Sequence, residues 1–118
     1  MRKRKNDRRL LGMWKSDRRR TFQHFVPRAG ATPEAVRKLR ALFGKLVVRW
    51  TRTMCYSQFD GHESSDPYEV VASDSKSVVI RSVDSLSNEN RLTQIHFEGR
   101  HYWICLGGMR EFFKRIQT

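Results

Sequence analysis

Histidine and cysteine side chains near the C-terminus of this sequence are the first candidates for chemistry. His96 and His101 flank a predicted hairpin turn, and Cys105 follows on the second strand of that hairpin. The group would suit a metal site or a Cys–His nucleophile pair, but the spacing fixes neither a third ligand nor an orienting acid. We favour ordinary polar residues at or near the surface, with Cys105 as a small core residue. The prediction is therefore a protein that is not an enzyme and that holds no metal ion or other cofactor, and a Cys/His enzyme is the least favoured alternative.

Acidic residues gather around a predicted turn in the middle of the chain. Asp60, Glu63, Asp66 and Glu69 lie within ten positions of one another. Such a group would suit a cation site or a pair of catalytic carboxylates, yet its spacing matches no calcium loop. Solvated turn residues are the favoured interpretation.

Positive charge is the strongest functional signal. The chain has 118 residues with 24 Lys and Arg against 12 Asp and Glu, a formal net charge of +12. Residues 1–50 contain 16 basic and 3 acidic side chains, whereas residues 51–118 contain 8 and 9. An excess of this size predicts an acidic partner, nucleic acid first and an acidic protein second. The predicted binding residues are twelve cations within the first forty positions: Arg2, Lys3, Arg4, Lys5, Arg8, Arg9, Arg18, Arg19, Arg20, Arg37, Lys38 and Arg40.

A second candidate site lies inside the predicted sheet. Alternation from Leu46 to Ser57 predicts one long strand, with Arg52 as the only charge on its inward face. An isolated buried charge is costly, so Arg52 either receives the anionic group of a ligand or reaches solvent or an acid at the barrel mouth, which we favour. Apolar residues around it either line a pocket or form an ordinary core, again the favoured interpretation. This alternative ligand site comprises Trp14, Trp50, Arg52, Met54, Tyr56 and Tyr102.

The elements that must position these residues are mostly strands. Asp60–Gly61 is a typical signal of a tight hairpin, and short apolar runs alternate with turn residues up to position 106. This pattern predicts a mainly β fold, an antiparallel meander of about six strands curled into a small barrel or half-barrel. The expected strands are 10–14, 46–57, 67–73, 78–83, 92–97 and 101–106.

Helical segments are expected at two places. Thr32, followed by Pro33, is a suitable start for a helix that Gly44 ends, inserted after the first strand. The apolar residues between Met109 and Ile116 recur at helical spacing and predict a C-terminal helix. Residues 1–9 are expected to be a disordered basic arm, and residues 10–118 a single β-barrel-like domain.

A resemblance supports the barrel. Gly12-Met13-Trp14 looks like the G-x-W of the first strand of lipocalin and fatty-acid-binding (calycin) barrels, and the element order over residues 10–116 is similar. In that superfamily an arginine late in the chain packs over the tryptophan, a structural role that the resemblance assigns to Arg110 beside Gly12 and Trp14. Calycin barrels usually have about eight to ten strands, more than the six expected here. The resemblance implies a lipocalin-like carrier of a small apolar or anionic ligand as the alternative function.

Location follows from what the chain lacks. The basic start is followed by too few apolar residues for a signal peptide, and no apolar stretch approaches the ~20 residues that span a bilayer. Two cysteines fit a reducing compartment. We expect a cytoplasmic protein without a membrane span, with a nuclear location as the alternative if residues 1–9 act as an import signal.

Overall fold

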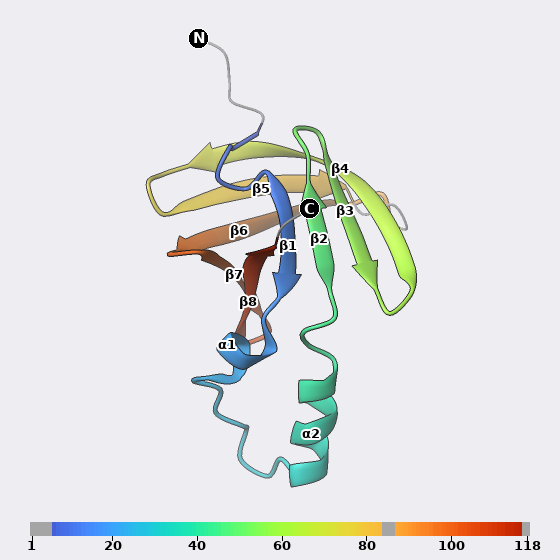
Figure 1. Cartoon of the computed structure of the whole chain (residues 1–118), viewed down its shortest axis with the longest axis vertical. Coiled ribbons are helices and arrows are strands. Elements are labelled where there is room, and N and C mark those ends of the chain that lie inside the picture. The colour runs from blue at the N-terminus through green and yellow to red at the C-terminus, as the bar shows by residue number, and fades with distance from the viewer. Residues whose placement is uncertain (1–5, 84–86, 117–118) are drawn as a thin grey trace.

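A closed barrel of eight antiparallel strands, arranged in chain order, forms the body of the protein (Figure 1). The structure, a computed structural model, describes residues 6–83 and 87–116. Two helices lie between the first two strands. The elements are β1 (Gly12–Ser16), α1 (Arg18–Phe22), α2 (Pro33–Ala41), β2 (Val47–Trp50), β3 (Met54–Phe59), β4 (His62–Ser73), β5 (Ser77–Val83), β6 (Asn90–Glu98), β7 (His101–Leu106) and β8 (Met109–Ile116).

The mainly β, antiparallel barrel is confirmed, but the predicted number of about six strands is wrong. One additional strand arises because the expected strand 46–57 folds into the hairpin β2–β3. Its turn is held by Thr51, whose hydroxyl accepts the backbone N–H of Met54 at 3.0 Å and donates to the Met54 carbonyl at 3.2 Å. A threonine turn of this kind interrupts the strand without glycine or proline, so the sequence pattern does not show it.

The other additional strand replaces the predicted C-terminal helix. Residues 109–116 form β8, which pairs with β7 on one side and with β1 on the other and so closes the barrel. Phe113 points into the barrel, whereas Phe112 points outward and is buried against α1. Burial on both faces of one strand produced the apolar spacing that resembles a helix.

Large aromatic side chains fill the barrel. Trp14 packs against Tyr102 with ring centroids 4.7 Å apart, and Tyr102 stacks on Phe113 at 4.8 Å. The Trp50 indole N–H donates to the Tyr102 hydroxyl at 3.2 Å. The rest of the core cluster comes from residues along the strands and from Leu10: Leu10, Val48, Tyr68, Val70, Val78, Ile80 and Ile95.

The described part of the predicted N-terminal arm is folded. Residues 1–5 lie outside the described part, but Asp7 is only 2% exposed and Leu10 is fully buried. Arg9 makes an ion pair with Asp7 at 2.8 Å. The segment is held because the apolar Leu10 anchors it and the Asp7 carboxylate neutralises the neighbouring guanidinium.

The helical insert stands at one end of the barrel (Figure 1). As predicted, Thr32 caps α2, its hydroxyl accepting the backbone N–H of Ala35 at 3.1 Å, and Pro33 begins the helix. None of the residues of α2 is buried. Neither helix in the described residues is of a length and apolarity that would cross a bilayer.

Candidate nucleic-acid interface

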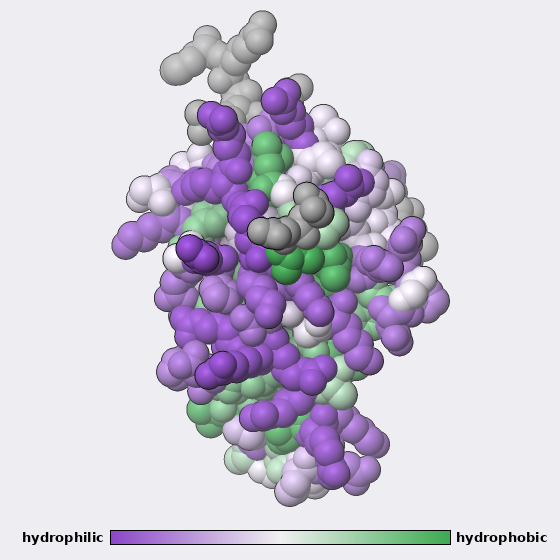
Figure 2. Space-filling view, viewed as in Figure 1, coloured by the Kyte–Doolittle hydropathy of each residue, from purple (hydrophilic) through white to green (hydrophobic). Residues whose placement is uncertain are grey.

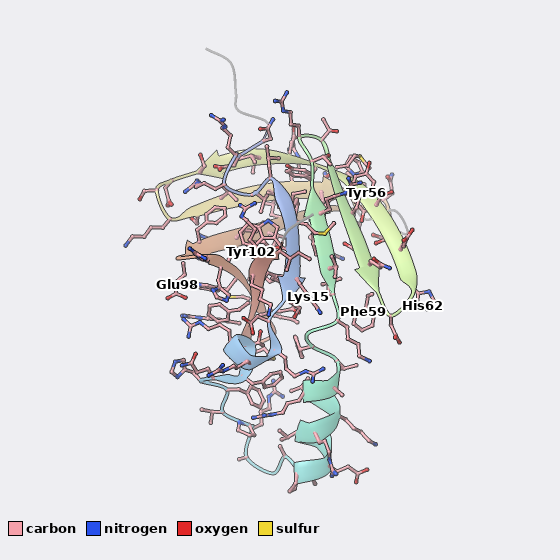
Figure 3. All side chains as sticks on the ribbon, in the orientation of Figure 1. Lys15, Tyr56, Phe59, His62, Glu98 and Tyr102 are labelled. Atoms are coloured by element: carbon pink, nitrogen blue, oxygen red, sulfur yellow. The ribbon has the colours of Figure 1, made fainter. Side chains whose placement is uncertain are left out.

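The β1–β8 pair, called the seam below, places two lysines side by side. Lys15 on β1 is directly opposite Lys114 on β8, and both side chains are exposed. His101 on β7 is opposite Lys114 on its other side. Like charges that face each other across a ladder destabilise a sheet, so packing alone does not account for this pair. Figure 3 shows Lys15 on β1.

Asp17 connects the seam to α1. It caps the helix by accepting the backbone N–H of Arg20 at 3.1 Å, and its other oxygen lies 3.0 Å from Nε2 of His101. Burial opposes ionisation of Asp17, but the bonds from Arg20 and His101, with the charge of Lys114, outweigh it and hold the pKa of the carboxyl below its usual range. Asp17 therefore stays ionised and fixes α1 against the strands that carry the cations.

Two surface grooves flank this junction, and both reach the β6–β7 turn. The seam groove has a volume of about 750 Å³ and is lined by four cations from three segments: Arg9, Arg100, Lys114 and Arg115. The α1 groove has a volume of about 540 Å³ and includes Arg20, His24, Phe112 and Arg110. Basic and aromatic side chains thus line adjoining depressions, a combination suited to phosphates and bases.

Arginines on the outer face are held against aromatic rings. The Arg110 guanidinium lies 4.2 Å from the ring centroid of Trp103, which also stacks on His96 at 3.8 Å. Arg20 lies 4.6 Å from the Phe112 ring and pairs with Glu98. Within residues 6–83 and 87–116, Arg110 has no carboxylate partner. A guanidinium positioned in this way keeps its N–H donors for a phosphate at little entropic cost.

Arg115 closes the barrel at the other end of β8. Its guanidinium lies 4.3 Å from the ring centroid of Trp14 and donates to the carbonyls of Leu11 and Arg9 at 2.7 and 2.8 Å. The resemblance predicted that Arg110 packs over Trp14, and this prediction is wrong. Arg115 is the residue opposite Trp14 in the β1–β8 register, whereas Arg110 lies near the other end of β8.

Gly12 makes room for this contact. Its φ is +122°, and a Cβ atom there would lie 2.6 Å from a terminal guanidinium nitrogen of Arg115. The Gly12-x-Trp14 motif and Arg115 therefore form one unit, in which the glycine admits the guanidinium and the indole supports it.

The predicted cationic site is divided between two places. Arg18 and Arg19 are exposed on α1 beside the seam, and Arg18 donates to the Phe43 carbonyl at 2.9 Å. Arg8 is exposed, whereas Arg9 is tied to Asp7. Arg37 and Lys38 lie on the projecting helix α2, apart from the seam, whereas the Arg40 guanidinium lies 5.2 Å from the ring centroid of Phe22 on α1. Arg2, Lys3, Arg4 and Lys5 lie outside the described residues.

Sequence reasoning missed the cations from the second half of the chain. The near-neutral charge of residues 51–118 is an average of an acidic region around β3 and β4 and a basic one on β8. Figure 3 shows His62, at the β3–β4 turn, on the opposite side of the view from Glu98 at the end of β6. A count over shorter windows would have separated the two regions. The missed residues of the second half are Arg100, Arg110, Lys114 and Arg115. Lys15, in the first half, was also left out of the predicted site.

The six residues of the alternative ligand site do not surround one cavity. Arg52 is exposed in the β2–β3 turn, so the prediction that it points inward is wrong. The turn also reverses the alternation: Cys55, not Met54, is opposite the inward Trp50. Tyr56 is 37% exposed and lies under the guanidinium of Arg49. The remaining members, Trp14, Trp50 and Tyr102, are core residues.

The histidine and cysteine candidates are also separated. His101 binds Asp17, whereas His96 stacks on Trp103. Cys105 is exposed near the end of β7, so its predicted place in the core is wrong. The described residues contain no cluster of three or more His, Cys, Asp or Glu side chains arranged to hold a metal ion.

The fold and the site together define a closed eight-stranded antiparallel barrel with a helical insert and a cationic seam. The chain matches no protein-family model, and no curated protein and no solved structure shows significant similarity to it.

Proposed function

We propose that this protein is a non-catalytic nucleic-acid-binding protein that holds phosphates along the seam and α1. The observation that carries the proposal is the pair Lys15–Lys114, placed in register on the outer face of the barrel. The closure of the barrel joins these lysines to the cations of α1, and phosphates would relieve their mutual repulsion.

The aromatic residues beside the seam favour single strands over duplex. Trp103, His96 and Arg110 form a stack on the outer face of β6–β8, where an unpaired base has a planar partner. Phosphate contacts alone carry no sequence information, so we expect little sequence preference.

The direct test is fluorescence polarisation of the whole chain with labelled oligonucleotides. Single strands and duplexes of roughly 20 nucleotides are titrated at about 50 mM and about 200 mM salt, with polyglutamate as the acidic-protein alternative. With six to eight phosphate contacts, the logarithm of the binding constant falls with a slope of about −4 to −6 on single strands and about −5 to −7 on duplex. Absence of binding at the lower salt would refute the proposal. Preference for polyglutamate would indicate that the partner is an acidic protein and not a nucleic acid.

The alternative function is a calycin-like carrier of a small apolar or anionic ligand. The arrangement that favours it is Gly12, Trp14 and Arg115, since the resemblance places an arginine over that tryptophan. The packed aromatic core opposes it, because a ligand inside the barrel must displace side chains such as Tyr102. Displacement of a fluorescent fatty acid tests the carrier function, and we expect none.

The proposed location is the cytoplasm. Cys55 and Cys105 are both free thiols, which fits a reducing compartment. Fluorescence microscopy of the tagged chain tests this proposal.

A further inference from the structure

An apolar groove lies at the helical end of the barrel, separate from the seam. This groove, called the lid groove below, has a volume of about 470 Å³. It runs between α2, the loop that precedes α2, and the β7–β8 turn. Its apolar lining comes from all three segments and includes Phe25, Val26, Val36, Leu39, Leu106 and Met109.

Apolar side chains that line the lid groove are unusually exposed to solvent. Val26 is 83% exposed and Leu106 is 47% exposed. Val36 and Leu39, on the inner side of α2, are only half-buried. Figure 2 shows apolar surface at this end of the molecule between hydrophilic residues. A contiguous apolar surface with a polar border is typical of an interaction site.

Charge around the lid groove is positive. Arg28 lines the groove itself, and a neighbouring depression that shares Val36 is lined by Arg37 and Arg40. Neither lining contains an acid, and Glu34 on α2 lies 3.5 Å from Lys38. An occupant must therefore combine apolar side chains with negative charge.

We infer that the lid groove docks an acidic amphipathic helix of a partner protein. An amphipathic helix uses apolar anchors spaced three and four residues apart to fill such a groove. The nine residues of α2 extend for about 13 Å, which offers two to three turns of contact. A second copy of this chain is disfavoured, because its own α2 would bring Arg37, Lys38 and Arg40 against the same cations. This inference is independent of the nucleic-acid proposal, which concerns the seam.

A designed peptide tests the lid groove. The probe is a labelled peptide of about 18 residues, with leucines on one face and glutamates on the other, titrated against the whole chain by polarisation. We expect binding to this peptide, and no binding to a scrambled peptide or to one with lysine in place of glutamate.

Matched variants locate the binding. Leu39→Gln and Leu106→Gln each remove an apolar anchor, and we expect binding about tenfold weaker. Leu92→Gln is the control, because Leu92 is 66% exposed on β6 and does not line the groove. Lys114→Gln should leave peptide binding unchanged, which separates this site from the seam.

Three results would overturn the inference. Equal binding of the scrambled peptide would show that the negative charge of the peptide alone accounts for its binding. Unchanged binding by both groove variants, with folding intact by circular dichroism, would place the peptide elsewhere. The third result is that the peptide does not bind. Dimerisation that is lost in Leu39→Gln would then assign the groove to a second copy, and binding to anionic phosphatidylglycerol vesicles that is lost in the same variant would assign it to lipid.

Discussion

Neutralising Lys114 should have opposite effects on stability and on binding. Lys114→Gln keeps the length of the side chain but removes one of the two facing charges of the seam. Loss of the cross-strand repulsion should raise the free energy of unfolding by about 0.2–1 kcal/mol. Loss of the attraction between Lys114 and Asp17 offsets part of this gain. One phosphate contact contributes about eightfold to duplex affinity, and about fivefold to single-strand affinity, at ~0.1 M salt relative to ~1 M. The variant should therefore bind nucleic acid more weakly by these factors while it unfolds at higher urea concentration.

The salt dependence separates a lost contact from a general charge effect. The slope of the logarithm of the binding constant against that of salt should become shallower by about 0.7 to 0.9 in Lys114→Gln. Arg52→Gln is the matched control, since it removes the same charge from the exposed β2–β3 turn. If the two variants lose equal affinity, or if the slope of Lys114→Gln equals that of the native chain, the seam does not hold phosphates.

Three further predictions concern the barrel itself. Burial, partly offset by a hydrogen bond from the Ser16 hydroxyl, raises the pKa of Glu111, so the folded state binds the proton more readily than the unfolded chain does. Stability should therefore fall as the pH rises above the ordinary pKa of a glutamate, and Glu111→Gln should reduce this dependence of the urea midpoint on pH. Gly12→Ala places a side chain at positive φ against Arg115 and should destabilise the fold by about 1–3 kcal/mol in urea denaturation; an unchanged midpoint would show that this contact is dispensable. Exposed Cys105 should react with a thiol reagent at mild alkaline pH about a hundredfold faster than Cys55, whose pKa burial raises to about 11, and equal rates would contradict the placement of the two thiols.

Local patterns predicted the parts of the fold that local interactions determine. Asp60 and Gly61 both have positive φ, as the predicted hairpin turn requires, and the cap at Thr32 begins α2 as expected. The threonine turn after Trp50 contains no glycine or proline, so the alternating pattern predicted one continuous strand across it. Residues 109–116 were predicted as a helix because Phe112, on the outer face of β8, is apolar as well as the inward Phe113, and Phe112 is buried against α1, which is distant in the sequence.

The candidate site was less predictable because barrel closure creates it. The excess of cations in the first fifty residues was evident, but Lys15 and Lys114 are neighbours only through the pairing of the first and last strands. The same pairing decides that Arg115, and not Arg110, stacks on Trp14. Sequence patterns show which residues carry charge, whereas the register of the closing strands decides which charges act together.

The most direct test of the account is amide chemical-shift mapping of the whole chain with a single-stranded oligonucleotide at low salt. We predict that shifts concentrate on β1, β8 and α1, and that they are absent from β3 and β4, where acidic residues gather. Shifts centred on β3 and β4, or none at any part of the seam, would contradict the central claim that barrel closure builds a phosphate-binding face.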